Sequence, residues 1–206
     1  RRRLQHFIDR KVAALYEPLL ALGRDESLQG LTRGFAFRLA EGLGASCVVG
    51  PLYAPVGKAR LGTESLRRAQ WERSVASLSQ LAQTAGNCGV RLGLEPLNRF
   101  ETDMINNVAD AQRFLQQVAS PHLGISLDSF HMNIEETDFR RAVVSAGEQL
   151  IHLQVSDSHR GVPGDGNSDW AGLRDGLRAI GYRGKIGIES FSPDASSLAE
   201  AVFVLL

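Results

Sequence analysis

Four short segments of the sequence end in the same pattern of side chains. They are RLGLEP, GISLDS, IHLQVS and KIGIES, and each alternates apolar residues with small or polar ones. Because successive side chains of a strand point to opposite faces, the alternation places apolar residues on one face and a carboxylate or an amide at the end of the other. If the segments are parallel strands, these side chains meet at one edge of the sheet: Glu95, Asp128, Gln154 and Glu189.

These four side chains have the chemistry of a divalent-metal site. Ionised carboxylates that crowd together repel one another unless a positive charge holds them. Three carboxylates and an amide oxygen are hard ligands, which suit Mn²⁺ or Mg²⁺ with positions left open for a substrate. A single acid at a strand end more often caps a helix or pairs with an arginine. The repetition over four strands favours the metal site.

The segment around Gln154 holds two further polar features. His152 shares the face of Gln154 but lies one layer deeper, so we expect a packed, hydrogen-bonded histidine rather than a metal ligand. The loop GVPGDG further on has glycines that would let backbone N–H groups cradle a phosphate. Asp165 in this loop opposes an anion, so we expect a turn that shapes the pocket wall.

The elements that must position these residues alternate along the chain. Apolar runs typical of strands cover 46–52, 90–98, 123–130, 150–157 and 184–191. Amphipathic stretches typical of helices cover 63–89, 107–120, 138–147 and 169–181, and a last helix begins near Asp194. This βα alternation predicts a parallel sheet. A dinucleotide-binding sheet would have a GxGxxG motif after its first strand, and the sequence has none.

The length of the chain bears on the architecture. A (βα)8 TIM barrel takes about 250 residues, whereas this sequence has 206. One more candidate strand lies around Ala13 to Leu22. We therefore expect an α/β chain forming a single TIM-barrel domain over residues 1–206, with five or six recognisable βα units. In this interpretation residues 1–30 are unassigned and the first strands are missing.

Composition argues against several classes of protein. Lys plus Arg and Asp plus Glu both total 23, and zero net charge gives no support to nucleic-acid binding. No apolar run approaches the roughly 20 residues that span a bilayer. Cys47 and Cys88 match neither a zinc motif nor a dense disulfide framework. We expect a cytoplasmic protein that binds neither nucleic acid nor membrane.

Four motifs together resemble a known family. GLEPLNRFETD, LDSFHMNIEE, HLQVSDSHRGVPGDG and IGIESF are similar to segments of the D-tagatose/D-psicose 3-epimerases, which are sugar epimerases among the xylose isomerase-like TIM barrels. The resemblance covers roughly residues 32–198. It implies that Glu95, Asp128 and Glu189 bind a divalent metal and that the two glutamates are also a catalytic acid/base pair. It further implies a dimer or tetramer, and substrate-hydroxyl contacts from Glu101, His131 and Arg160.

Gln154 departs from that family, which usually has a metal-binding histidine at this position. Hydroxypyruvate isomerases, which resemble relatives of that family on the same barrel, use a glutamine as a metal ligand in a similar HIQ stretch. The change keeps a ligand and exchanges an imidazole for an amide oxygen. Gln154 therefore favours, as an alternative, a hydroxypyruvate isomerase-like aldose–ketose isomerase.

The predicted reaction is C3 epimerisation of a free ketose. A metal neutralises the enediolate charge that develops when the proton next to a ketone is removed. Glu95 and Glu189 would flank the sugar, one removing the C3 proton and the other returning a proton to the opposite face. Asp128 and Gln154 would position the metal, and His131 would polarise the O2 end of the substrate.

Other interpretations stay open. Taken alone, His131 is also consistent with packing under a loop, and Glu101 and Arg160 with solvated surface charges. A non-catalytic relative would keep the four residues on an incomplete barrel with exposed edge strands. A nuclease on the same barrel is a weaker match, because it needs a zinc-binding histidine cluster and the sequence has five histidines: His6, His122, His131, His152 and His159.

Overall fold

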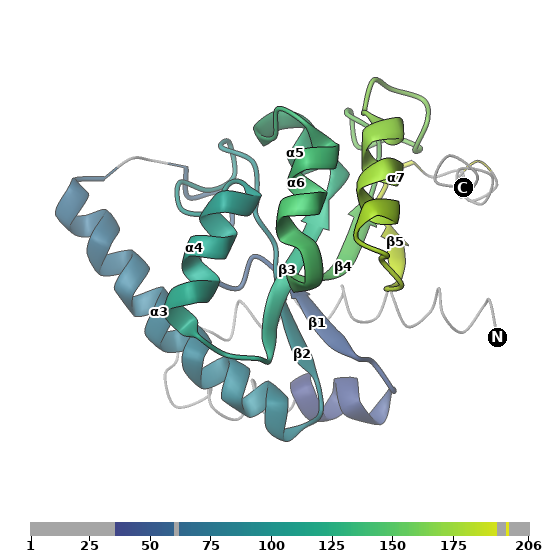
Figure 1. The fold of residues 1–206 in the computed structure, drawn as a ribbon. Helices are drawn as coiled ribbons and strands as arrows, with labels where there is room; N and C mark the ends of the chain where they lie inside the picture. The colour runs from purple at the N-terminus through teal and green to yellow at the C-terminus, as the bar shows by residue number, and fades with distance from the viewer. Residues whose placement is uncertain (1–35, 60–61, 193–196, 198–206) are drawn as a thin grey trace.

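A computed structural model describes residues 36–59, 62–192 and 197 of the chain. Among these residues, five strands form one parallel sheet in chain order (Figure 1). They are β1 (Cys47–Gly50), β2 (Arg91–Leu94), β3 (Leu123–Asp128), β4 (Leu150–Val155) and β5 (Ile186–Ile188). Each lies inside a range predicted from the sequence, so the parallel α/β sheet is confirmed.

Four helices match the predicted ones. They are α3 (Glu64–Asn87), α4 (Val108–Val118), α6 (Phe139–Ala146) and α7 (Trp170–Ala179). Each begins after a Thr, Asn or Asp whose side chain accepts a backbone N–H of the first turn, as N-cap residues do. Within the described part of the chain, no helix combines the length and apolar character that crossing a membrane requires.

Two helical segments were not predicted. Residues 36–42 are helical, and α5 (Ser129–Glu135) follows β3 directly. The predicted strand 123–130 ends at Asp128 because Asp128 Oδ1 accepts the N–H of Phe130 at 2.8 Å and caps α5. A short 3₁₀ turn, η1 (Gly147–Gln149), leads into β4. The candidate strand near Ala13–Leu22 and the helix from Asp194 lie outside the described residues.

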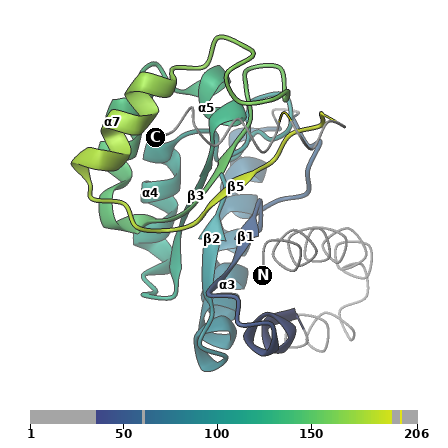
Figure 2. The same cartoon turned by 90° about the vertical axis from the view of Figure 1, so that its right-hand side faces the viewer.

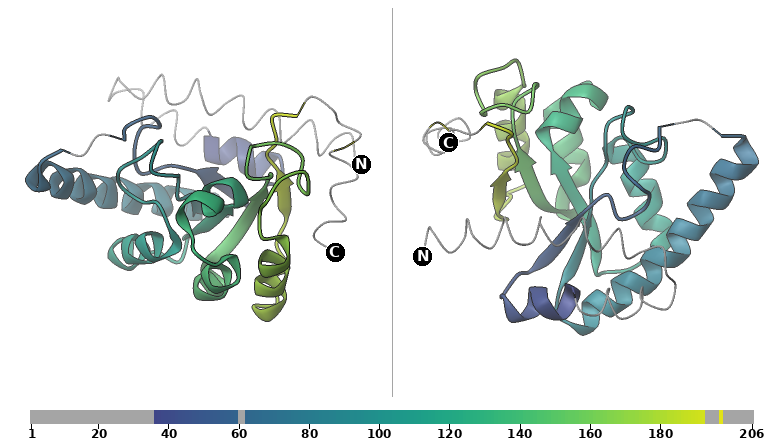
Figure 3. Two further views of the ribbon diagram at one scale, coloured as in Figure 1. Left: turned by 90° about the horizontal axis from the view of Figure 1, so that it is seen from above. Right: turned by 180° about the vertical axis from the view of Figure 1, so that it is seen from behind.

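Helices α3, α4, α6 and α7 lie along one face of the sheet, as Figures 1 and 3 show and as Figure 2 shows from the β5 side. The core fills the space between that face and the helices. Fully burying one large apolar side chain contributes about 1.5–3 kcal/mol. The predicted apolar face of the strands supplies one wall of the core and the helices supply the other: Leu92, Leu94, Ile125, Leu127 and Leu153 pack with Leu78, Phe114, Val143 and Leu173.

The strand register sets the heights of the polar side chains. Asp128 pairs with Gln154, and the pair Ser126 and His152 lies one layer below, so His152 is deeper as predicted. Gln154 in turn pairs with Gly187, which places Glu189 two residues further along. Such stagger between neighbouring strands is a property of barrels. The polar strand ends therefore rise from β2 to β5 instead of forming a level ring.

Candidate active site

The structure brings the four predicted strand-end residues to one edge of the sheet. Glu95 follows β2, Asp128 ends β3, Gln154 is the penultimate residue of β4, and Glu189 follows β5. The amide Nε2 of Gln154 donates to Glu189 Oε2 at 2.6 Å, which joins the β4 and β5 ends. The sequence pattern therefore located a real cluster of polar groups.

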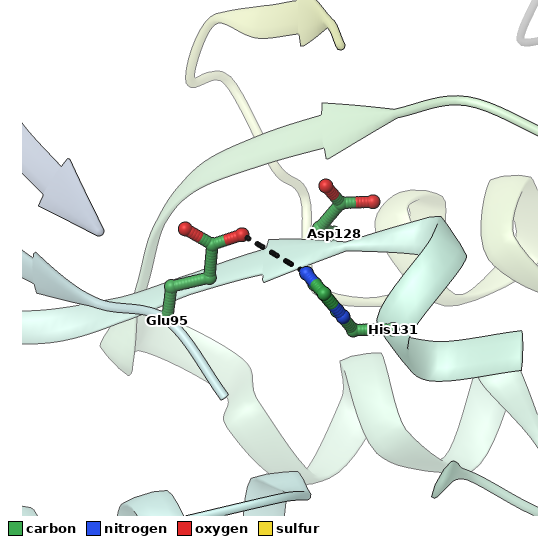
Figure 4. A group of neighbouring side chains, drawn as sticks. All are labelled: Glu95, Asp128 and His131. Atoms are coloured by element: carbon green, nitrogen blue, oxygen red, sulfur yellow. Dashed lines mark ion pairs between the residues drawn. The ribbon is translucent and has the colours of Figure 1, made fainter. Parts of the chain in front are cut away.

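Three of the clustered side chains come from the β2–β3 side. Figure 4 shows Glu95, Asp128 and His131 directed toward one another. One ligand atom from each lies within 4.8 Å of the others, and His131 Nε2 is 3.8 Å from Glu95 Oε1. All three residues are buried. By distance alone, these three could hold a metal ion.

The hydrogen bonds of His131 decide which of its nitrogens carries the proton. The backbone N–H of Asn98 donates to Nδ1 at 3.1 Å, and Asn98 Nδ2 lies 2.9 Å from the same atom. A backbone N–H only donates, so Nδ1 accepts, and the proton of a neutral His131 is on Nε2. Arg160 Nη2, which also only donates, lies 3.2 Å from Nε2 and therefore cannot form a hydrogen bond with this tautomer. Burial lowers the His131 pKa, which favours the neutral ring. A protonated Nε2 cannot ligate a metal, so His131 is better suited to donate a hydrogen bond into the site.

Arg160 reaches the same cluster from the loop after β4. Its Nη1 contacts Asp128 Oδ2 and lies 3.7 Å from Glu189 Oε2. The guanidinium stacks 4.6 Å from the ring centre of Phe130, a cation–π arrangement. Burial lowers the Arg160 pKa, but the surrounding carboxylates outweigh this effect and raise it. Arg160 therefore stays charged and belongs to the site rather than to a solvated surface.

Crowded carboxylates make the site hold protons more tightly than isolated acids would. Burial raises the Glu95 pKa well above its usual range, and the charges of Asp128 and Glu189 raise it further. Burial, with the charge of Asp128, raises the pKa of Glu189 to about 7. Acids with such pKa values are suited to proton transfer at neutral pH.

The donor set fits a divalent cation. Among the described residues, Gln154 Oε1 is a buried oxygen with no hydrogen-bond partner. A buried unsatisfied acceptor costs about 1–3 kcal/mol, and a cation is one group that would satisfy it. Asp128 keeps Oδ2 facing the site because Oδ1 caps α5. Carboxylate and amide oxygens suit Mn²⁺ or Mg²⁺. Among the described residues the distances group Glu95 and Asp128 with His131, whereas donor chemistry favours the oxygens of Glu95, Asp128, Gln154 and Glu189.

Glu101 lies at the margin of the cluster. Its Oε1 accepts from Asn98 Nδ2 at 2.8 Å, so Asn98 joins Glu101 to His131. Asn98 is itself buried. Sequence reasoning missed this asparagine, although a buried polar residue between Glu95 and Glu101 in EPLNRFE is a usable signal.

The loop after β4 is a turn, as predicted. Backbone amides of this loop donate to the side chain of Asp157 instead of facing an anion from solution. Asp157 Oδ2 accepts the N–H of Gly164 at 2.7 Å, and Asp157 Oδ1 accepts the N–H of Ser168 at 3.1 Å. Sequence reasoning did not single out Asp157. The usable signal is the run of glycines and serines after it, because a carboxylate can accept hydrogen bonds from the backbone amides of such a loop.

The chain belongs to the xylose isomerase-like TIM barrel family, whose model matches residues 21–204. This membership, together with the parallel sheet, confirms the predicted TIM-barrel fold class.

Comparison with individual proteins shows which members of the family this chain is similar to. The chain is 40% identical over 156 residues to an L-ribulose 3-epimerase of Mesorhizobium japonicum, covering 76% of this chain and 52% of that protein. A crystal structure of D-psicose 3-epimerase with D-tagatose from Clostridium cellulolyticum H10 matches with a TM-score of 0.74 and 31% identity, covering 88% of this chain and 64% of that one. The resemblance to ketose 3-epimerases inferred from the motifs is confirmed. The chain spans about half the length of the curated relatives it matches.

A structural neighbour with a different substrate is also similar. The apo 3-keto-D-glucoside 4-epimerase from E. coli matches with a TM-score of 0.77 and 30% identity, covering 84% of this chain and 68% of that one. Epimerases of this fold therefore act at more than one sugar carbon.

Proposed function

We propose that this chain carries the active site of a ketose 3-epimerase that binds one divalent ion, Mn²⁺ or Mg²⁺. The observation that carries the proposal is the cluster of acids at the strand ends: Asp128 and Glu189 face Arg160, and Glu189 accepts from Gln154, whose buried Oε1 has no partner among the described residues. The similarity to L-ribulose and D-psicose 3-epimerases supports a ketose as the substrate.

Glu95, Asp128, Gln154 and Glu189 would hold the metal. A bound divalent ion supplies the positive charge that an enediolate needs as it forms. Glu95 and Glu189 come from β2 and β5, with two strands between them, so they can approach a sugar from different sides. One removes the C3 proton and the other returns a proton to the opposite face, which inverts the carbon.

The remaining residues orient the sugar. His131 donates from Nε2 toward O2 of the ketose, because Asn98 occupies Nδ1. Arg160 and Glu101 contact hydroxyl groups, and the Arg160 charge lowers repulsion among the carboxylates. Homo-oligomerisation as a dimer or tetramer, a cytoplasmic location and a single domain over 1–206 remain predictions.

The test is solvent exchange at C3. The chain is loaded with Mn²⁺ and incubated in D₂O with D-fructose, D-psicose, D-tagatose and L-ribulose, and deuterium incorporation is followed by NMR. We expect deuterium at C3 together with the C3 epimer, and loss of both after metal removal with EDTA. Absence of C3 exchange in every ketose would contradict the proposal. Glu95→Gln is the matched control, because it keeps the side-chain shape and removes the base.

Gln154 supports a second candidate, an aldose–ketose isomerase acting on hydroxypyruvate. The amide ligand that separates this chain from the usual ketose epimerase pattern is the observation in its favour. Proton transfer between C2 and C3 of hydroxypyruvate, with all four ketoses inert, would select this activity. A metal-loaded chain inactive on both substrate types would support a non-catalytic relative.

A further inference from the structure

The backbone of Arg160 is held in an unusual conformation. Its φ is 62°, in the left-handed region that residues with a Cβ rarely adopt. Such conformations persist only where surrounding contacts impose them, and they concentrate at functional sites. The contacts around Arg160 therefore indicate what holds its guanidinium in the cluster.

Asp157 holds the backbone on one side of Arg160 and closes the loop that carries it. Its backbone carbonyl accepts the N–H of Arg160 at 2.9 Å, and its backbone N–H donates to Gly161 O at 3.2 Å. Its carboxylate accepts four hydrogen bonds from the rest of the loop. Oδ1 accepts from the amides of Ser158 at 2.7 Å and Ser168 at 3.1 Å. Oδ2 accepts from the amide of Gly164 at 2.7 Å and from Trp170 Nε1 at 3.0 Å. The residue is fully buried. A charged side chain thus closes the loop that carries Arg160.

The carboxylate of Asp157 is stabilised by these neutral donors. Burial raises its pKa, but hydrogen bonds from backbone N–H groups outweigh that effect and hold the pKa well below its ordinary value. Gly166 lets the loop approach closely, because a Cβ there would lie 2.2 Å from Asp157 Oδ1. The loop therefore closes tightly around an ionised side chain.

The far side of Arg160 is fixed to the end of β5. Its carbonyl accepts the N–H of Phe191 at 2.9 Å and the hydroxyl of Ser190 at 3.2 Å. Both residues directly follow Glu189, so the position of the loop also sets how Arg160 faces that glutamate. Asp157 on one side and the β5 end on the other leave Arg160 little freedom.

We propose that Asp157 is a positioning residue that acts through Arg160: it closes the 157–170 loop and so aims the guanidinium at the substrate and the carboxylates. The role of Arg160 as a substrate contact rests on the proposed function. The closure of the loop by Asp157 does not, so the two can be tested separately.

The first measurement needs no activity. Trypsin cleaves after arginine, and a guanidinium held in the site protects the Arg160–Gly161 bond. Asp157→Asn should speed native-state cleavage there by about tenfold or more relative to cleavage after Arg113 in α4, because lost hydrogen bonds of this kind change opening equilibria by that factor. Asp165→Asn, which removes an exposed carboxylate from the same loop, should leave the ratio unchanged. An unchanged ratio in Asp157→Asn would overturn the proposal.

The second measurement is a double-mutant cycle on the metal-loaded chain. Asp157→Asn should raise the KM for the ketose about tenfold with a smaller change in kcat, because a contact made equally in the ground and transition states acts on KM. In an Arg160→Ala background the same substitution should add little. Additive effects would mean that Asp157 does not act through Arg160. If the unaltered chain turns over no ketose, the proposed function fails while the cleavage ratio still decides the role of Asp157.

A second variant covers the case in which Asp157→Asn does not fold. Gly166→Ala keeps the carboxylate of Asp157 in the chain but displaces it, because the new Cβ would lie 2.2 Å from Asp157 Oδ1. The φ of Gly166 lies outside the left-handed region, so alanine does not strain its backbone. It should also speed cleavage after Arg160, and normal protection in a folded Gly166→Ala protein would count against the proposal.

Discussion

The two sides of the site differ in how firmly their polar groups are held. On the β2–β3 side, Glu95, Asp128 and His131 are 6%, 1% and 3% exposed, and helix α5 begins within the cluster. On the β4–β5 side, the Glu189 side chain is 39% exposed and Arg160 is carried on a loop. One side is preorganised by burial, and the other depends on hydrogen bonds between a loop and a strand end. The β4–β5 side is therefore the more exposed and less firmly held of the two.

The largest expected effect compares the two glutamates. Glu95→Gln and Glu189→Gln should each lower kcat by on the order of 10²–10⁴-fold, because each removes one member of the proposed acid/base pair. Turnover of the ketose at saturation measures the effect. Glu101→Gln is the matched control at the margin of the cluster, and it should act mainly on KM. Full turnover by either of the first two variants would break the acid/base assignment.

The next effect concerns Gln154, the proposed amide ligand of the metal. Gln154→Leu should weaken Mn²⁺ binding by on the order of 10–100-fold, since it removes an amide oxygen and offers nothing in return. Gln154→His replaces the oxygen by an imidazole nitrogen and should retain binding. Titration calorimetry of the metal-free chain with Mn²⁺ measures both. Equal affinity of Gln154→Leu and the unaltered chain would show that β4 does not supply a ligand.

A smaller effect is expected at the buried support of His131. Asn98→Asp places an acceptor 2.9 Å from Nδ1 and a second carboxylate beside Glu101. We expect a loss of about 1–3 kcal/mol in the free energy of unfolding, while Nδ1 stays unprotonated because the backbone N–H of residue 98 still donates to it. Urea denaturation measures the first and ¹⁵N chemical shifts of His131 measure the second. A proton on Nδ1 in the unaltered chain would contradict the assignment of the proton to Nε2.

The pH dependence of stability separates Asp157 from the other acids. Because its folded pKa is depressed, Asp157 contributes stability above its ordinary pKa near 3.8, and that stability is lost as the pH falls below this value. The advantage of the unaltered chain over Asp157→Asn should therefore be constant from pH 7 to about pH 5 and shrink toward pH 3. Denaturation of both proteins across this range tests it. A pH-independent difference would show that Asp157 is not held as an anion.

The smallest effect lies outside the site. Gly176 lets α7 approach α6, because a Cβ there would lie 2.9 Å from Val143 Cβ and 3.2 Å from Arg140 Cα. Gly176→Ala should cost about 1 kcal/mol of stability, since overpacking exceeds the gain in helix propensity. Thermal unfolding measures the cost, and kcat should stay unchanged. A large change in kcat would mean that the framework and the site are not independent.

Sequence patterns predicted the strands well for a physical reason. The alternation in RLGLEP or GISLDS records which face each residue presents, and that face is fixed by burial of Leu92, Leu94, Ile125 and Leu127. The same alternation located Glu95, Asp128, Gln154 and Glu189. What it did not predict was α5, which follows β3 without a turn residue to separate them.

The supporting contacts of the site were not predictable in the same way. Asn98 reaches His131 across 33 positions of sequence, and Asp157 reaches Trp170 across 13. No local period records such contacts, because they depend on how loops fold over the strand ends. His131, Glu101 and Arg160 were named from the resemblance, whereas the groups that hold them became visible only in three dimensions.

The divided role of Asp128 gives the site a spectroscopic reporter. One carboxylate oxygen accepts the amide of Phe130 at the start of α5, while the other faces Arg160 and the position proposed for the metal. A cation bound by the carboxylate withdraws electron density from it, which weakens the hydrogen bond from the Phe130 amide. The Phe130 N–H resonance should therefore shift when the site fills, and it would give an affinity for any ion without a turnover assay.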